Sequence, residues 1–247
     1  MNLVVDIGNT CVKLVAFDDM TPIEEVRMEH GEMTPLTQMC QRYVFSHGIY
    51  SSVVSLDEKM LGFFNSQDFP MLQFQPDQTP IPIRNRYLTP GTLGGDRLAA
   101  AIGAYGECPD NNILIVDVGT CITYDFVDSN GNYMGGNISP GPTIRLKALH
   151  QYTDSLPLVV RKGEVLFHGN STDTAIRSGV MLGVKYEVEG YVSACFNRMP
   201  DLKVFLTGGV QLDLQFPENT QIIKDGFIVP KGLNRVLIYN KEKLSDQ

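Results

Sequence analysis

The sequence predicts an α/β protein made of two similar lobes with a cleft between them. The first observation is a pattern of apolar strand, aspartate, glycine turn and returning strand at residues 3–17, which recurs at residues 113–124. The second is the helical spacing of apolar residues at 174–199. The third is the length of 247 residues, which at roughly 150 residues per domain suits two lobes.

We expect the first lobe over residues 1–110, beginning with a β-hairpin. Residues 3–7 and 11–17 are rich in strand-forming residues, and Gly8-Asn9-Thr10 between them has turn chemistry. Farther along, the pattern predicts a strand at 50–55, a short helix at 57–65 and, led by Asp96, a helix at 98–105. Four prolines predict an extended segment over residues 76–90.

The second lobe is expected over residues 111–247, after a Pro-Asp-Asn-Asn linker. Its hairpin is followed by a loop at 135–141 that is too rich in glycine and proline for regular structure. A helix at 143–150, the long helix, a strand at 204–207 and a small α/β tail from residue 213 complete the lobe. Glycines 179, 183 and 190 each cost the long helix about 1 kcal/mol relative to alanine, so they indicate close packing or backbone approach, or a weaker helix.

Composition excludes several classes of function. Lys and Arg number 20 against 28 Asp and Glu, and no basic cluster could follow a phosphate backbone, so nucleic acid is not an expected partner. No run approaches the roughly 18 uncharged apolar residues that span a bilayer, and no basic and apolar leader precedes Asp6. We therefore expect a cytoplasmic protein without membrane association. The 5 cysteines lack a Cys-x-x-Cys pair and the 4 histidines lack metal-ligand spacing, which predicts reduced thiols and no transition-metal site.

The two aspartate turns are candidates for a polyphosphate site. Taken singly, each favours a hairpin turn whose carboxylate caps backbone amides. Taken as a pair facing one cleft, they would present glycine amides and the hydroxyls of Thr10 and Thr120 to phosphates, while Asp6 and Asp117 hold cations. The sequence has neither a Walker P-loop nor a Gly-x-Gly-x-x-Gly motif after a strand, which disfavours the P-loop and Rossmann nucleotide sites.

Gly94-Gly95-Asp96-Arg97 is the candidate acceptor site of a phosphoryl transfer. Such a reaction needs a carboxylate that takes a hydroxyl proton and an anchor that holds the acceptor, and Asp96 and Arg97 offer both. The alternative is that Asp96 caps the following helix and Arg97 forms an ion pair on its surface. Gly208-Gly209, after the last predicted strand, either admits a flat ring or forms a plain turn.

Together these motifs resemble the type III pantothenate kinases of the acetate and sugar kinase/actin superfamily. The resemblance covers residues 2 to about 210 and implies two tandem ribonuclease-H-like (actin-like ATPase) lobes. The motifs that carry it are Asp6-Ile7-Gly8-Asn9-Thr10, Tyr87 with Gly94-Gly95-Asp96-Arg97, Asp117-Val118-Gly119-Thr120, Gly-Gly-Asn-Ile-Ser-Pro-Gly at 135–141, and Asn170-Ser171-Thr172 with Ala175-Ile176 and Ser178-Gly179.

The resemblance also implies a role for individual residues. Asp96 would be the catalytic proton acceptor, and Asp117 would bind a monovalent cation, potassium or ammonium. Magnesium would accompany ATP, organised through water by Asp6. The implied ATP contacts are Asp6, Ile7, Gly8, Asn9, Thr10, Cys11, Val12, Lys13 and Thr120, and the implied pantothenate contacts are Tyr87, Gly94, Gly95, Asp96, Arg97 and Thr172.

The implied activity is ATP-dependent phosphorylation of the primary hydroxyl of pantothenate to 4′-phosphopantothenate, the first step of coenzyme A biosynthesis, by a homodimer that completes the substrate site. A related-fold sugar kinase or phosphatase and a non-catalytic nucleotide-binding accessory regulator are the alternatives. The family usually has alanine where this chain has Cys121, and a thiol of similar size should be tolerated there.

Overall fold

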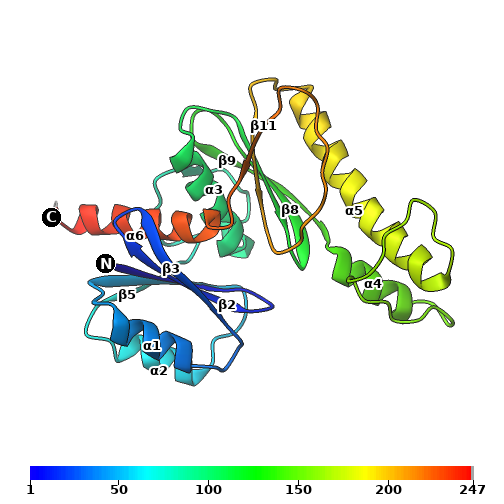
Figure 1. The fold of residues 1–247 in the computed structure, drawn as a ribbon. Coiled ribbons are helices and arrows are strands. Elements are labelled where there is room, and N and C mark those ends of the chain that lie inside the picture. Colours follow the sequence, from blue (N-terminus) through cyan, green and yellow to red (C-terminus); the bar gives the residue numbers. More distant parts are fainter. Residues whose placement is uncertain (246–247) are drawn as a thin grey trace. The chain divides into compact units, whose positions relative to one another are not determined.

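The computed structural model describes residues 1–245 and divides them into two compact α/β units (Figure 1). The first unit comprises Met1–Asn111, Phe126–Gly135 and the chain from Gly226 on. The second comprises Asn112–Asp125 and Gly136–Asp225. The sequence predicts a single boundary at residues 110–111. The structure instead groups the tip of a later β-hairpin, Phe126–Gly135, and the C-terminal helix with the first unit.

A five-stranded mixed sheet forms the centre of the first unit, in the order β3-β2-β1-β4-β5. The predicted hairpin is confirmed, because β1 and β2 pair antiparallel around the Gly8-Asn9-Thr10 turn. On its other side β1 pairs parallel with β4. The strands are β1 (Asn2–Ile7), β2 (Val12–Asp18), β3 (Thr21–Met28), β4 (His47–Ser52) and β5 (Met71–Gln73).

Four helices and one 3₁₀ turn accompany this sheet. The predicted helix at 57–65 is present, and its first turn is capped by the Asp57 carboxylate, which accepts the Met60 N–H at 2.7 Å. The elements are α1 (Thr34–Arg42), α2 (Glu58–Asn65), η1 (Pro90–Thr92), α3 (Gly95–Glu107) and α6 (Ile228–Ser245).

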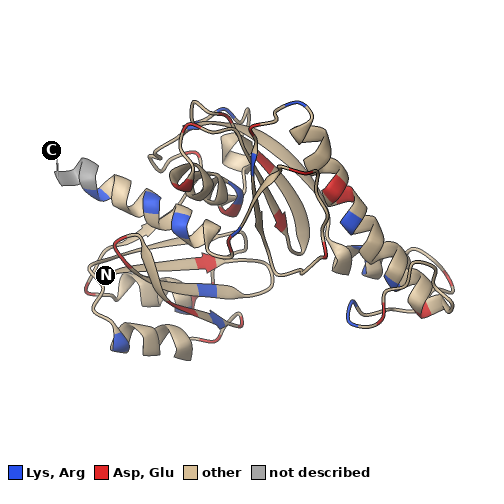
Figure 2. Ribbon diagram, turned by 45° about the horizontal axis from the view of Figure 1, so that its top comes forward, with Lys and Arg blue, Asp and Glu red and all other residues tan. Residues whose placement is uncertain are grey.

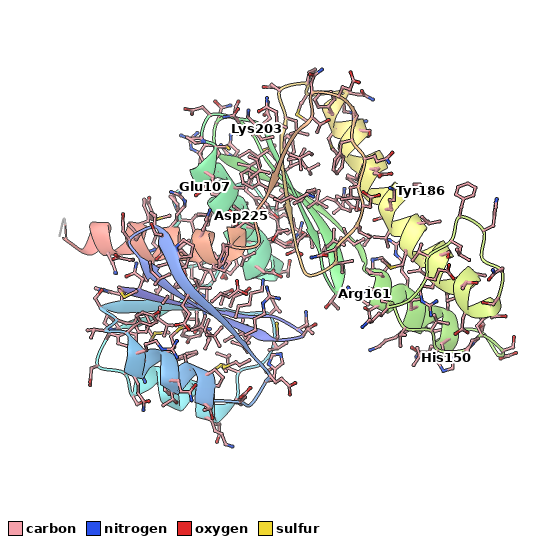
Figure 3. All side chains as sticks on the ribbon, in the orientation of Figure 1. Glu107, His150, Arg161, Tyr186, Lys203 and Asp225 are labelled. Carbon is pink, nitrogen blue, oxygen red and sulfur yellow. The ribbon has the colours of Figure 1, made fainter. Side chains whose placement is uncertain are left out.

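Close backbone contact joins α6 to α3, which is why α6 belongs to the first unit (Figure 1). A Cβ atom on Gly232 would overlap the Ala99 carbonyl oxygen, and one on Gly103 would overlap the backbone of α6. At the end of α3, Glu107, labelled in Figure 3, forms ion pairs with Arg235 at 3.1 Å and Lys231 at 3.4 Å. The two glycines therefore allow the backbones of the helices to approach closely, and the ion pairs of Glu107 link the helices at one end.

The second sheet has six strands in the order β11-β10-β7-β8-β9-β6. Its strand β10 pairs parallel with both β7 and β11. The predicted strands at 113–118, 121–124 and 204–207 are all confirmed. The strands are β6 (Arg84–Asn85), β7 (Ile113–Val118), β8 (Cys121–Val127), β9 (Asn132–Pro140), β10 (Lys203–Thr207) and β11 (Gln221–Lys224).

The prediction of an irregular loop at 135–141 was wrong, because β9 continues through Pro140. The glycines allow the strand to continue. Gly136 lies so close to β8 that a Cβ atom would overlap the carbonyl oxygen of Tyr124. Gly135 has φ +94°, a left-handed conformation that disfavours side chains. Close strand approach, rather than loop formation, explains this glycine-rich composition.

Two helices belong to the second unit, α4 (Pro142–Gln151) and α5 (Thr172–Phe196), and both were predicted. The face of α5 that carries Val180, Val184, Val188 and Val192 is buried, as the spacing indicated. The close packing expected at Gly179, Gly183 and Gly190 is not found within the described chain, since a Cβ atom at each would have no neighbour within 4 Å.

Acidic and basic residues are interspersed on both units (Figure 2). None of the helices described over residues 1–245 combines the length and hydropathy needed to traverse a bilayer.

Candidate functional site

The first phosphate-binding candidate is the turn between β1 and β2. The Gly8 N–H donates to the Cys11 carbonyl at 3.1 Å and closes the turn, which leaves Asn9 and Thr10 exposed at its tip. Ile7 and Val12 face each other across the hairpin and are buried in the core. These two side chains therefore support the turn from behind, and only their main chain could reach a nucleotide.

Asp6 lies at the carboxyl end of β1, between two polar neighbours. Lys13 is its partner on β2 and Ser51 is its partner on β4. Residues paired in this way project from the same face of a sheet, about 5 Å apart. Asp6 and Lys13 are both half-buried. The turn thus has a carboxylate and an ammonium group beside it, both held by strand register.

The N-terminus of α3 packs against Ser51, the β4 neighbour of Asp6, and no sequence motif had indicated a functional role for this serine. A Cβ atom on Gly95 would overlap the Ser51 hydroxyl oxygen, so only glycine fits there. Strand β4 therefore brings the end of β1, which carries Asp6, close to the first turn of α3, which carries Asp96.

Asp96 occupies the second position of α3, and the N-cap residue is Gly94. Its Oδ1 atom accepts the Arg97 N–H at 2.8 Å. A Cβ atom on Gly94 would come within 2.5 Å of that same oxygen. Gly94 thus leaves space for the carboxylate at the helix N-terminus, where the helix dipole stabilises negative charge.

Arg97 does not lie on the helix surface, in contrast to the alternative of a surface ion pair. Its side chain is 6% exposed, and its Cζ atom lies 5.9 Å from the centroid of the Tyr87 ring, within cation–π range. Tyr87 in turn lies beside the backbone of Gly135, where a Cβ atom would come within 3.2 Å of its ring. The structure therefore brings together Arg97 and Tyr87, two of the residues implied to contact pantothenate.

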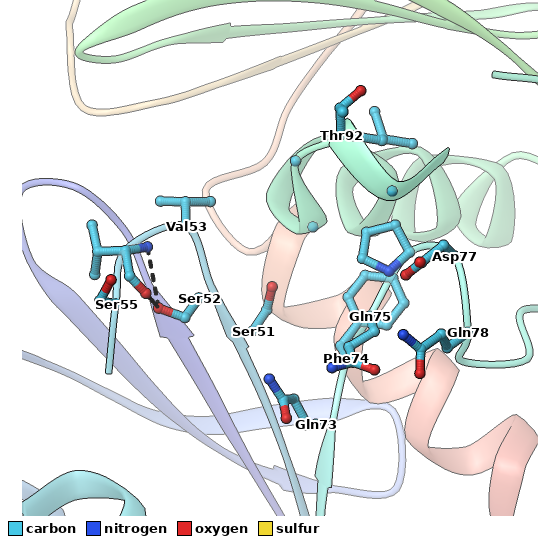
Figure 4. Close-up of a pocket in the computed structure, with 16 residues that line it drawn as sticks. Ser51, Ser52, Val53, Ser55, Gln73, Phe74, Gln75, Asp77, Gln78 and Thr92 are labelled. Carbon is cyan, nitrogen blue, oxygen red and sulfur yellow. Dashed lines mark hydrogen bonds between the residues drawn. The ribbon is translucent and has the colours of Figure 1, made fainter. Parts of the chain in front are cut away.

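A cavity of about 600 Å³ adjoins Gly94 and Gly95 within the first unit (Figure 4). This volume lies within the roughly 300–1,000 Å³ of small-molecule sites. Most of its wall is neutral and hydrogen-bonding. The lining residues are Ser51, Ser52, Val53, Val54, Ser55, Gln73, Phe74, Gln75, Pro76, Asp77, Gln78, Gly91, Thr92, Leu93, Gly94 and Gly95.

The second phosphate-binding candidate, in the second unit, repeats the geometry of the first. The Gly119 N–H donates to the Cys121 carbonyl at 2.9 Å and closes a turn with Thr120 exposed at its tip. The turn is one residue shorter than its counterpart, as the sequence indicated. The Cys121 side chain is exposed, so the substitution for alanine does not disturb the core.

Asp117, at the end of β7, lies against Gly208 at the end of β10. Gly208 has φ +102°, and a Cβ atom on it would lie 2.6 Å from the Asp117 Oδ1 atom. The two expectations for Gly208-Gly209 were a plain turn and room for a ring. The structure adds a third reason for glycine, which is space for a carboxylate.

Asp117 and the turn that follows it carry two oxygen-bearing side chains. Oxygen ligands fit hard cations, and Asp117 and Thr120 supply a carboxylate and a hydroxyl on one turn. Among the residues that the structure describes, no three His, Cys, Asp or Glu side chains gather at a point where they could hold a metal ion.

Thr172 lies at the first turn of α5. Ser171 and Thr174 cap this helix reciprocally: the Ser171 hydroxyl accepts the Thr174 N–H at 3.2 Å, and the Thr174 hydroxyl accepts the Ser171 N–H at 2.9 Å. Thr172 between them is exposed. The capping pair thus leaves the Thr172 side chain directed away from the core of its unit.

A polar cluster around Glu187 was missed at the sequence level. It joins side chains of β8, β9, α4 and α5 that are far apart in sequence, so no local pattern could have indicated it. Its members are Tyr124, Asn137, Ser139, Arg145, Glu187 and Tyr191.

The fold and the paired aspartate turns define the class as α/β proteins of the actin-like ATPase fold. The activator of the 2-hydroxyisocaproyl-CoA dehydratase from Clostridium difficile, solved with bound ADPNP, matches with a TM-score of 0.54 at 15% identity, over 99% of this chain and 96% of that chain. A ROK hexokinase from Thermus thermophilus matches with a TM-score of 0.51 at 12% identity, over 97% and 99%.

Residues 2–194 match the type III pantothenate kinase family. A type III pantothenate kinase of Bacteroides fragilis is 45% identical over 244 residues, which cover 99% of this chain and 100% of the relative. The chain belongs to the type III pantothenate kinase family.

Proposed function

We propose that this kinase transfers the γ-phosphoryl group of ATP to the primary hydroxyl of pantothenate, giving 4′-phosphopantothenate for coenzyme A biosynthesis. The observation that carries the proposal is the match to the family along almost the whole chain. The geometry within each unit supports it, because each contains a phosphate-type turn and the first also contains a carboxylate beside a cavity of suitable size.

Asp96 is the proposed proton acceptor. The carboxylate lies at a helix N-terminus, where the absence of a Cβ atom on Gly94 gives it space, next to the residues that line the cavity. A general base needs an accessible, ionised carboxylate within hydrogen-bond reach of the acceptor hydroxyl. Asp96 would take the hydroxyl proton as the oxygen attacks the γ-phosphorus.

The turn from Gly8 to Thr10 is proposed to hold the ATP phosphates. Its exposed tip offers main-chain N–H groups and the Thr10 hydroxyl, and Lys13 adds a positive charge beside it. Asp6 would hold ATP-bound magnesium through water, in keeping with the preference of this ion for one or two carboxylates and several waters. When bound, magnesium neutralises charge on the phosphates.

In the second unit, Thr120 is the proposed nucleotide contact and Asp117 the proposed ligand of potassium or ammonium. Such a cation would offset phosphate charge that a Walker lysine offsets in P-loop enzymes. Gly208 allows the Asp117 carboxylate to lie against the end of β10 without overlapping a side chain there.

Arg97 and Tyr87 are the proposed anchors for pantothenate. The substrate bears a carboxylate far from the reacting hydroxyl, and a buried guanidinium held against an aromatic ring is a suitable partner for it. Exposed Thr172 is proposed to contact pantothenate bound to a second copy of the chain, so that a homodimer forms the complete site.

The test is product identification by mass spectrometry, with ATP, magnesium, pantothenate and either potassium or sodium. We expect 4′-phosphopantothenate and ADP in equal amounts. A hexose or a phosphate ester is the comparison substrate. Folded protein that binds ATP but forms no phosphopantothenate with any cation would refute the proposal, and phosphorylation of the hexose instead would favour a sugar kinase.

A further inference from the structure

Glu187, in the middle of α5, is the centre of a partly buried hydrogen-bond cluster in the second unit. One of its oxygens accepts the Tyr124 hydroxyl at 2.9 Å and also the Ser139 hydroxyl. Its other oxygen forms an ion pair with the Arg145 guanidinium. The side chains of Glu187 and Arg145 are only 25% and 23% exposed, so water screens this pair less than a surface pair.

The protonation of the cluster is consistent with a charged Glu187. Burial would raise the pKa of Glu187, but hydrogen bonds from Arg145, Ser139 and Tyr124 outweigh it and leave the pKa below its usual range. Burial, together with the bond to Glu187, raises the pKa of Tyr124, which stays a neutral donor. The Tyr124 ring stacks on Tyr191 at 3.9 Å between centroids, with the planes 14° apart.

Arg145 connects this cluster to the end of β9. Its Nε atom donates to the Pro140 carbonyl at 2.7 Å, while its Nη2 atom pairs with Glu187. The planar guanidinium thus links the Glu187 carboxylate to the Pro140 carbonyl in a single fork of donors. Ser139, the residue before it, is bonded to Glu187 directly.

Gly141, the next residue, contacts the second phosphate-type turn. Its N–H donates to the Thr120 carbonyl at 3.0 Å. The contact is tight, because a Cβ atom on Gly141 would overlap the carbonyl oxygens of both Gly119 and Thr120. Residues 139–141 therefore form a bridge between the Glu187 cluster and the turn.

We propose that Glu187, acting through Arg145 and the bridge at 139–141, is a positioning residue that holds the Gly119–Thr120 turn in place for ATP. The proposal rests on the proposed nucleotide contact of Thr120. In this role Glu187 acts on the turn and not on a substrate. It limits the displacement of the turn from the geometry that binds ATP. Displacements of about 1 Å at a substrate contact can lower the rate on the order of 10²-fold.

The main variant is Glu187→Gln, which keeps size and hydrogen-bonding capacity but removes the charge that holds Arg145. We expect the KM for ATP to rise on the order of 10-fold, the scale of one lost charge-assisted hydrogen bond, while the KM for pantothenate changes less than twofold. Glu187→Asp, which restores the charge, should recover part of the ATP affinity.

Glu189→Gln is the matched control. Glu189 lies on the same helix, pairs with Lys185 at 3.4 Å and accepts the Gln215 N–H at 2.6 Å, but it has no bond to residues 139–145. The substitution removes the same charge from a similarly buried pair. An equal rise in the KM for ATP in both variants would overturn the proposal, because it would show a general effect of weakening α5.

Amide hydrogen exchange provides a readout that does not depend on ATP. Glu187→Gln should speed exchange in the peptides that contain Gly141 and residues 117–122, whereas Glu189→Gln should not. Unchanged exchange there would overturn the positioning role.

Thr120→Ala separates this proposal from the proposed nucleotide contact. If Thr120→Ala raises the KM for ATP and Glu187→Gln does not, the positioning role is refuted. If Thr120→Ala leaves ATP binding unchanged, the nucleotide role of Thr120 fails, and the positioning role for ATP fails with it.

Discussion

Gly208→Ala tests whether the dependence of activity on potassium requires the Asp117 carboxylate to keep its position against Gly208. Gly208 has φ +102°, a region that costs a residue with a Cβ atom about 1–2 kcal/mol. The new methyl group would also lie 2.4 Å from the Val118 carbonyl oxygen and 2.6 Å from the Asp117 Oδ1 atom, and relieving such overlaps typically costs about 1–3 kcal/mol. We expect a loss of about 2–5 kcal/mol in the free energy of unfolding, and a fall of roughly 4–20 °C in Tm for a chain of this size.

Movement of the Asp117 carboxylate should also change the dependence of activity on potassium. Displacing Asp117 should raise the potassium concentration for half-maximal activity several-fold, and Asp117→Ala should abolish the difference between potassium and sodium. The assay is ADP release at saturating ATP and pantothenate, titrated with each chloride salt at constant ionic strength, with thermal melts on the same samples.

Gly209→Ala is the matched control, because a Cβ atom at this adjacent glycine would have no neighbour within 4 Å. It should leave both the Tm and the potassium titration close to those of the unchanged protein. The reasoning is refuted if Gly208→Ala lowers Tm as expected yet keeps the original potassium response, or if unchanged protein is equally active in potassium and sodium.

Three further predictions concern catalysis, assembly and acid stability. Asp96→Asn should lower kcat by about 10²-fold or more, which is the scale of a lost general base, with little change in ATP affinity. Near-normal turnover would show that Asp96 has a structural role only. Light scattering should give a homodimer, and mixing inactive Asp96→Asn with inactive Thr172→Ala subunits should restore activity, whereas an active monomer would contradict a shared site. Because the pKa of Glu187 is below its usual value of about 4.3, its stabilising effect is complete above that pH and is lost as pH falls through its folded pKa; acid melts of Glu187→Gln should lack this component.

Local chemistry explains the features that could be predicted from sequence. Gly-Asn between two apolar runs produced the hairpin of β1 and β2, and the same pattern with one residue fewer produced the hairpin of β7 and β8. A capping aspartate began α2, and a valine every fourth residue marked the buried face of α5. In each case the residues that determine the element lie within one or two turns of each other. The aspartates at the strand ends were found for the same reason.

Glycine was the residue type that the sequence left most ambiguous. Only the tertiary structure shows what each glycine faces: the β8 backbone at Gly136, the Asp117 carboxylate at Gly208, the β4 serine at Gly95 and open space at Gly179. The same holds for Glu187 and Arg145, which are 42 positions apart and meet because α5 packs against α4. Strand ends, turns and helix faces are encoded by neighbouring residues, whereas close approach and partially buried charge pairing depend on segments that only folding brings together.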